Sequence, residues 1–183
     1  QNATFQLASN NKTIICTANC NDQNTGVFNG VTYTVYDNSS LANKSISDTD
    51  WNRVVTTGVT DMRMLFKDSS FNQDISSWDT SSVSNMEGIF QNTSSFNQDI
   101  AYWDLSSMID QNGVNQMLDG ADALNQDLSY WCFPSGLSDD KLQNIVGNNN
   151  PIASNNAYKP RRDGGWSNVY NSDCRTAKVA PAP

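Results

Sequence analysis

The chain has 183 residues, of which 37% are hydrophobic and 16% charged, so it can form one domain with a modest core. Its 11 basic and 19 acidic residues give a net charge of −8, which argues against nucleic acid and anionic membranes as partners. No stretch approaches the roughly 18 apolar residues of a membrane span. The polarity comes from neutral side chains: 25 Asn, 22 Ser and 13 Thr.

The chain has no histidine, and Glu87 is its single glutamate. A Ser-His-Asp or Cys-His nucleophile and a histidine general base are therefore excluded. We expect no catalytic residue, no metal site and no cofactor. The spacing of the four cysteines does not match paired CxxC motifs, and two disulfides in an oxidising compartment are the simpler interpretation. Four cysteines allow three pairings among Cys16, Cys20, Cys132 and Cys174.

The sequence begins at Gln1 without a methionine, which is typical of a secreted protein after removal of its signal peptide. Residues 31–36 alternate and are rich in strand formers, so they predict a strand. Ser47–Asp50 followed by Trp51 predicts a capped helical turn over residues 48–56. We interpret residues 1–58 as an N-terminal segment and cap for the repeats that follow.

The central part of the chain is an internal repeat. The segment Phe71–Trp78 recurs at Phe96–Trp103 and, in a degenerate form, at Leu124–Trp131, with steps of 25 and 28 residues. A second block with Val, Met and Leu or Phe precedes each copy, from Val59, Val83 and Val114. Repeats of this length predict an array of stacked units, here over residues 59–132.

Within a unit, Val83, Met86 and Phe90 share one face of a short helix, and Ile75–Trp78 forms an extended segment. A unit this small cannot bury its own apolar stripe, so successive units must stack into a short solenoid. Exposed tryptophans could instead form a platform for sugars, but burial fits their apolar neighbours better. The predicted core ladders are Phe71, Phe96 and Leu124, and Trp78, Trp103 and Trp131.

The phrase FNQDISSWDTSSVSNMEGIF resembles the repeat of the BspA-like surface proteins, also called the DUF285 or mycoplasma-lipoprotein repeat family. Val27–Tyr33 is similar to the segment that leads into such arrays, and Trp131-Cys132 to their closing unit. The resemblance implies a secreted or surface-attached protein linked to adhesion. It also implies an α/β, leucine-rich-repeat-like solenoid of about three 25-residue units, each a short extended segment plus a short helix.

Proximity together with this resemblance implies that Cys16 pairs with Cys20 and Cys132 with Cys174, so that disulfides pin the N- and C-terminal caps. The C-terminal cap covers residues 133–176 and contains a candidate helix, Ser138–Val146. Residues 177–183 end in Ala-Pro pairs and are interpreted as a Pro/Ala linker.

Other motifs were weighed against simpler interpretations. Asp139-Asp140 could be glycosidase carboxylates, but acidic residues at the start of a helix are commonplace. Asn21–Gly26 only partly imitates a calcium loop. Composition alone predicts about five N-glycosylation sequons, and the secreted setting favours occupation of at least two in a eukaryotic host. The sequons begin at Asn2, Asn11, Asn38, Asn43 and Asn92.

The sequence therefore predicts a non-enzymatic extracellular structural glycoprotein at the cell surface. It would be a subunit of a surface layer or filament, assembled head to tail from identical copies and carrying covalent glycans. The alternative is an adhesion module that holds a protein or glycan on the face of its repeats. A carbohydrate-active enzyme is the third hypothesis.

Overall fold

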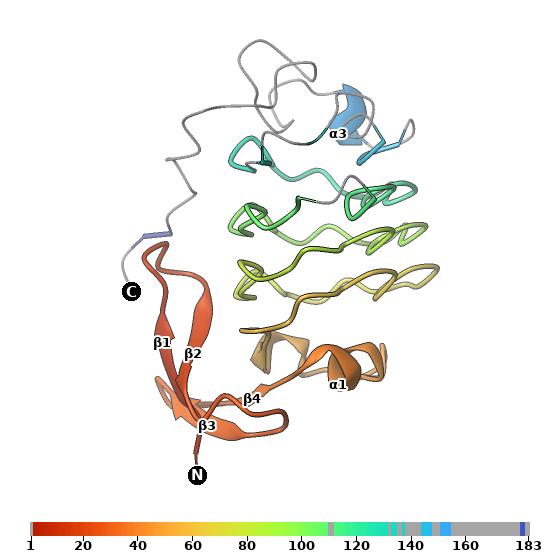
Figure 1. Cartoon of the computed structure of the whole chain (residues 1–183). Coiled ribbons are helices and arrows are strands. Elements are labelled where there is room, and N and C mark those ends of the chain that lie inside the picture. Colours follow the sequence, from red (N-terminus) through yellow and green to blue (C-terminus); the bar gives the residue numbers. More distant parts are fainter. Residues whose placement is uncertain are drawn as a thin grey trace.

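The computed structural model describes residues 2–109, 112–131, 133–134, 137, 144–147, 151–154 and 180–181. Two parts of the chain are built differently. Small β-sheets occupy residues 4–55, and irregular turns follow them through the repeats, one turn lying above another (Figure 1). We call residues 59–132 the repeat region.

The first sheet is a hairpin of β1 (Thr4–Leu7) and β2 (Ile14–Ala18), paired antiparallel. The turn Ala8–Thr13 joins the two strands. The predicted Cys16–Cys20 disulfide is confirmed, and it links β2 to the chain that follows it.

The second sheet contains β3 (Thr25–Phe28), β4 (Val31–Val35) and β5 (Val54–Val55). β3 and β4 are antiparallel, whereas β5 runs parallel to β4. Asn29 and Gly30 connect β3 to β4 with φ values of 49° and 77°. Asn-Gly is the preferred pair for such a two-residue hairpin turn, because both positions need a left-handed backbone.

The two sheets pack closely at Gly26. A Cβ added there would lie 2.0 Å from the carbonyl oxygen of Ala3, so only glycine lets β1 approach β3. The Ala3 N–H donates to the Thr25 carbonyl at 2.9 Å. The small core between the sheets contains Ala3, Phe5, Ile14, Cys16, Val35 and Val55.

Short helices lie outside the repeat region. α1 (Asn38–Ala42) is a single turn, and Asp37 and Ser40 cap it reciprocally. A 3-10 turn, η1 (Trp51–Arg53), leads into β5, and α3 (Pro151–Ser154) follows the repeats.

The predicted α/β fold, a leucine-rich-repeat-like solenoid of short extended segments and short helices, is wrong. Among the described residues of the repeat region there is neither a helix nor a strand, only an isolated bridge between Asp61 and Asn85. The expected extended segment Ile75–Trp78 is instead a turn, closed by a hydrogen bond from Trp78 N–H to the Ile75 carbonyl. The regular structure of the described chain is mostly the two small sheets.

Left-handed residues prevent the helix that was expected over Val83–Phe90. Gly88, inside the segment, has a φ of 58°, and an α-helix cannot pass through such a residue; Asn92, just beyond it, is left-handed as well, with a φ of 56°. The N–H groups of Met86, Gly88 and Phe90 consequently leave the unit. They donate at 2.8–2.9 Å to carbonyls of the next one, those of Gly113, Asn115 and Met117.

Backbone hydrogen bonds also show where the extra residues of the third unit lie. The N–H groups of Val59, Val83 and Met108 each close a turn with the carbonyl three residues earlier. Met108 therefore corresponds to Val83, although the sequence alone aligned Val83 with Val114. Val114 instead corresponds to Met86, because the Met86 N–H bonds to the neighbouring Gly113 carbonyl. The insertion lies between Met108 and Val114.

Aromatic rings pack against one another from Trp51 through the first two repeat units to Trp103. Trp78 and Trp103 stack with centroids 6.2 Å apart, and their indole N–H groups donate to carbonyls of the preceding turn. Trp51 begins this series with no preceding unit below it, so its buried Nε1 has no partner among the described residues. All six residues of the expected ladders are buried: Phe71, Trp78, Phe96, Trp103, Leu124 and Trp131.

Several predictions fall on residues that the structure does not describe. The Cys132–Cys174 pair lies outside the described residues, as do most of the candidate helix Ser138–Val146 and of the C-terminal cap that was expected over 133–176. Strand β4 falls within the expected 31–36, and η1 within the expected helical turn 48–56.

Candidate functional site

Amide side chains bond one repeat unit to the next. The Asn72 side-chain oxygen accepts from Asn97 N–H at 2.9 Å and from Gln98 Nε2 at 2.9 Å. Asn97 accepts in the same way from Asn125 and Gln126, at 2.9 and 2.8 Å. We call Asn72, Asn97 and Asn125 the asparagine ladder. Its regularity explains the repeated Asn-Gln pair.

Aspartates of the repeats stabilise the turns within each unit. A side-chain oxygen of Asp74, Asp99 and Asp127 accepts from the backbone N–H two residues later, at 2.9–3.1 Å. These are Asx turns, in which a short acidic side chain replaces a backbone acceptor. These three carboxylates thus support the backbone, whereas Asp139 and Asp140, which were weighed as glycosidase carboxylates, lie outside the described residues.

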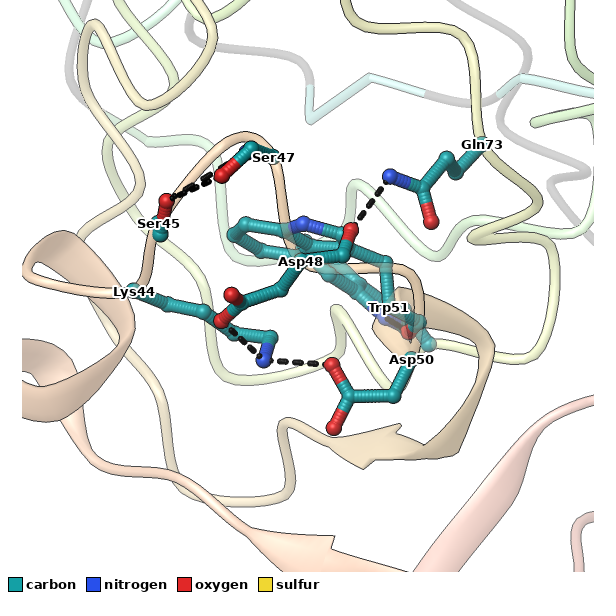
Figure 2. Close-up of polar contacts among 8 residues, drawn as sticks. Lys44, Ser45, Ser47, Asp48, Asp50, Trp51 and Gln73 are labelled. Carbon is teal, nitrogen blue, oxygen red and sulfur yellow. Dashed lines mark hydrogen bonds and ion pairs between the residues drawn. The ribbon is translucent and has the colours of Figure 1, made fainter.

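A buried lysine holds together residues 36–51, which come directly before the repeat region (Figure 2). Only 4% of the Lys44 side chain is exposed, and its ammonium bonds to Asp48 at 2.9 Å and to Asp50 at 2.6 Å. It also lies over the rings of Tyr36 and Trp51. We call these five residues the lysine cluster. Figure 2 shows Gln73 donating to the Asp48 carbonyl, at 2.6 Å, which continues the inter-unit bonds toward the N-terminus.

The carboxylates determine the ionisation of the lysine cluster. Burial alone would lower the pKa of Lys44, but the hydrogen bonds that its ammonium donates to Asp50 and Asp48 more than offset this and raise the pKa above its ordinary value of 10.5. The Lys44 hydrogen bond lowers the pKa of Asp50 below its ordinary 3.8. The cluster is therefore a closed ion-pair network at neutral pH, with no acid or base left poised for proton transfer.

A groove of about 340 Å³ opens between the β1–β2 hairpin, the β3–β4 hairpin and the first repeat. Its apolar lining consists of Leu7, Ile14, Phe28, Val31 and Tyr33. Burial raises the pKa of the Tyr33 hydroxyl. Its polar lining consists of Asn11, Lys12, Asn29, Asn52, Asp74 and Ser77. We call this feature the hairpin groove.

The rim of the hairpin groove differs from the repeats in how it uses polar side chains. The amides of the asparagine ladder are bonded to neighbouring units, whereas those of Asn29 and Asn52 make no hydrogen bond within the described part of the chain. The apolar floor and these available amides make the groove a candidate binding surface among the described residues. Sequence reasoning missed it, because its walls come from segments far apart in the chain.

The sequon asparagines lie in different surroundings. Asn2 and Asn43 are exposed, and Asn11 belongs to the β1–β2 turn. The Asn38 amide is engaged with Thr60, and the Asn92 Nδ2 donates to Asp68 at 2.7 Å. The Asn43 Nδ2 likewise donates to the Ser39 carbonyl at 2.8 Å, so a glycan on Asn38, Asn43 or Asn92 would disturb an existing contact.

The segment Asn21–Gly26, which only partly imitates a calcium loop, makes structural hydrogen bonds. The Asp22 carboxylate accepts from the Ser40 hydroxyl at 2.6 Å and from the Asp37 N–H at 3.2 Å. Within the described residues, no group of three or more His, Cys, Asp or Glu side chains could hold a metal ion. No helix in that part of the chain is long and apolar enough to cross a membrane.

Successive turns are joined by side-chain hydrogen bonds and by backbone hydrogen bonds between equivalent residues. This arrangement defines a repeat protein. The model of one family, described as a Mycoplasma protein of unknown function, DUF285, matches residues 25–152. The chain belongs to the DUF285 family. No curated protein and no solved structure matches it.

Proposed function

We propose that this protein is a non-enzymatic extracellular structural glycoprotein, a subunit of a cell-surface layer or filament built from identical copies. The asparagine ladder is the observation that carries the proposal. Side chains that would be available in a catalytic site instead bond one unit to the next, with the same geometry at both junctions. A scaffold needs this use of polar groups, because each bond fixes the spacing of successive units.

The hairpin groove supplies a contact surface for such an assembly. Its apolar floor is open to solvent, and Val31 on its wall is 36% exposed. Removing apolar surface from water contributes about 25 cal/mol per Å², so a partner that fills the groove gains stability. In Figure 1 the two hairpins lie at one end of the molecule, where a neighbouring copy can reach them.

A charge placed in the groove tests this assembly. Val31→Asp puts an unpaired carboxylate on the groove wall, whereas Val27→Asp is a matched control, because Val27 is 69% exposed and the alternation of β3 points it to the opposite face of the hairpin. Electron microscopy and sedimentation should show filaments or sheets for the parent chain and for Val27→Asp, and monomers for Val31→Asp. A parent chain that remains monomeric at high concentration would overturn the proposal.

Glycosylation in a eukaryotic host is part of the same proposal. Asn2 is the sequon best placed to carry a glycan, because it is exposed and its side chain makes no hydrogen bond within the described part of the chain, whereas the amides of Asn38 and Asn43 are engaged. Mass spectrometry of tryptic peptides from protein secreted by such a host should find Asn2 occupied more often than Asn38 and Asn43, whose amides are engaged with Thr60 and with the Ser39 carbonyl. Equal occupancy at all sites would contradict this ranking.

A binding module is the second candidate function, and the available amides of the groove rim favour it. In this alternative the groove holds a protein segment or a glycan, and the adhesion role that the sequence suggested would be located there. Ligand binding by a strictly monomeric preparation, lost in Val31→Asp and kept in Val27→Asp, would favour it over self-assembly.

A further inference from the structure

Asparagine is followed by glycine at two places in the chain, and valine comes next in both: Asn29-Gly30-Val31 and Asn112-Gly113-Val114. Asparagine is a thermolabile residue, and a following glycine has no side chain to hinder attack by its backbone nitrogen on the asparagine amide. Because the residues after each asparagine are identical, a difference in reactivity between the two pairs reports mainly on their structural surroundings.

The first pair is open to solvent. Asn29 and Gly30 form the tip of the β3–β4 hairpin, and both residues are exposed. Neither the Asn29 amide nor the Gly30 N–H makes a hydrogen bond within the part of the chain that the structure describes. A Cβ built on Gly30 would meet no atom within 4 Å. The attacking nitrogen and the amide carbon are therefore both accessible to solvent.

The second pair is held by the repeat region. Gly113 is buried, and its carbonyl accepts from the Met86 N–H at 2.8 Å. The Asn112 carbonyl accepts from the Asn115 N–H at 3.1 Å. Rotating this backbone to close a ring would break one bond between repeat units and one within a turn, whereas an exposed hairpin tip opens locally at lower cost.

We propose that Asn29 is a site of spontaneous deamidation, which converts an amide on the rim of the hairpin groove into a carboxylate. The Gly30 nitrogen gives up its proton and bonds to the Asn29 side-chain carbon Cγ. The bond from Cγ to Nδ2 breaks, and ammonia leaves with a proton in place of that bond. Water then opens the cyclic succinimide at either carbonyl, adding its hydroxyl to the carbon and its hydrogen to the nitrogen. The product is aspartate or isoaspartate, and water is the only co-reactant.

The new carboxylate changes the charge of the hairpin groove. Besides the Tyr33 hydroxyl, the ionisable groups of its lining are Lys12 and Asp74, whose charges cancel at neutral pH. Deamidation leaves the groove with an excess negative charge, and every copy of the chain already carries a net charge of −8. Like charges disfavour contact between identical copies. The modification therefore weakens assembly as the protein ages, a consequence that rests on the proposed function, whereas the modification itself does not.

Peptide mapping tests the modification independently of assembly. Full-length protein without glycans is incubated in mildly alkaline buffer, and samples are digested with pepsin at acidic pH to prevent further deamidation. Mass spectrometry should find Asn29 deamidated about threefold to tenfold faster than Asn112 in the folded protein. In urea the two rates should converge, because the hydrogen bonds that protect Asn112 are lost. Equal rates in the folded protein, or a faster reaction at Asn112, would overturn the inference.

Two variants test the effect on assembly. Asn29→Asp mimics the aspartate product. Asn29→Gln keeps an amide that does not close the same ring, and Gln23, with a φ of 60°, shows that glutamine adopts a left-handed backbone in this chain. Sedimentation should find a smaller assembled fraction for aged than for fresh parent protein, and a similarly small one for Asn29→Asp. The assembled fraction of Asn29→Gln should not change on ageing.

The outcomes distinguish the two proposals. Deamidation at Asn29 that leaves the assembled fraction unchanged would overturn the effect on assembly and leave the structural role intact. A parent chain that never assembles, but in which Asn29 reacts faster than Asn112, would overturn the structural role and support the modification site.

Discussion

The two parts of the molecule satisfy their backbone in different ways. The N-terminal sheets pair N–H and carbonyl groups along strands, with a glycine at Gly26 for close approach and a disulfide at Cys16–Cys20. The repeat region uses Asx turns and hydrogen bonds between equivalent residues of successive units. Its stability therefore depends on neighbouring units being present, whereas the sheets depend on local pairing.

The largest effect is expected from the aromatic core of the repeats. Phe90 is fully buried and stacks with the rings of Phe66, Phe96 and Trp103. Phe90→Ala therefore removes all three ring contacts and leaves a cavity in the core. We expect the free energy of unfolding to fall by about 3–5 kcal/mol in urea titrations. Hydrogen exchange should rise in all three units. A rise confined to residues near Phe90 would show that the units are independent of one another.

Removing the disulfide should affect the other part of the molecule. Cys16 and Cys20 are four positions apart, so the bond closes a short loop, and replacing both by alanine should cost about 2 kcal/mol. Hydrogen exchange should increase in β1 and β2 and stay unchanged in the repeats. Reduction of the parent protein with a mild thiol is the control, and increased exchange at Trp103 after either treatment would contradict the separation of the two parts.

A smaller effect is expected from the asparagine ladder. Asn97→Ala removes an oxygen that accepts from Asn125 and Gln126, and we expect a loss of about 1–2 kcal/mol in thermal or urea unfolding. Asn97→Asp keeps a side-chain acceptor at this position and should lose less. Equal losses in both variants would show that the oxygen is not the stabilising group.

The smallest effect is a pH dependence of the lysine cluster. Because the folded pKa of Asp50 lies below 3.8, its contribution is present above that pH and is lost as the pH falls through the folded pKa. Because the folded pKa of Lys44 lies above 10.5, its contribution is complete below 10.5 and is lost as the pH rises through the folded value. Lys44→Met should flatten the acid limb of a stability curve below about pH 4, and Lys67→Met should not. An unchanged acid limb in Lys44→Met would count against the ion pair.

Some features followed from local chemistry and were therefore accessible from sequence. The spacing of Phe71, Phe96 and Leu124 indicated which residues recur, because equivalent positions keep their chemical type. The Cys16–Cys20 bond followed from short separation together with a family resemblance, and the DUF285 match confirms that family. The Asn29-Gly30 turn was also readable, since this pair is the strongest short hairpin signal, but it was overlooked.

The helix over Val83–Phe90 was mispredicted because the apolar spacing and the capping residues before it were given more weight than Gly88 inside the segment. Three apolar residues at helical spacing also fit a chain whose alternate N–H groups bond to another unit, and Gly88 within the segment allows the left-handed turn that this requires. Hydrogen bonding to a residue about 27 positions away leaves no periodic trace in the segment itself.

The sequence by itself determined the repeat, its family, the N-terminal disulfide and the absence of histidine chemistry, because each depends on residue type and on spacing along the chain. Only the tertiary structure decided that the repeats are irregular turns, that Lys44 is buried between two aspartates, and that a groove opens between the hairpins. These features depend on which distant backbone and side-chain groups meet, and that is set by packing of the whole chain.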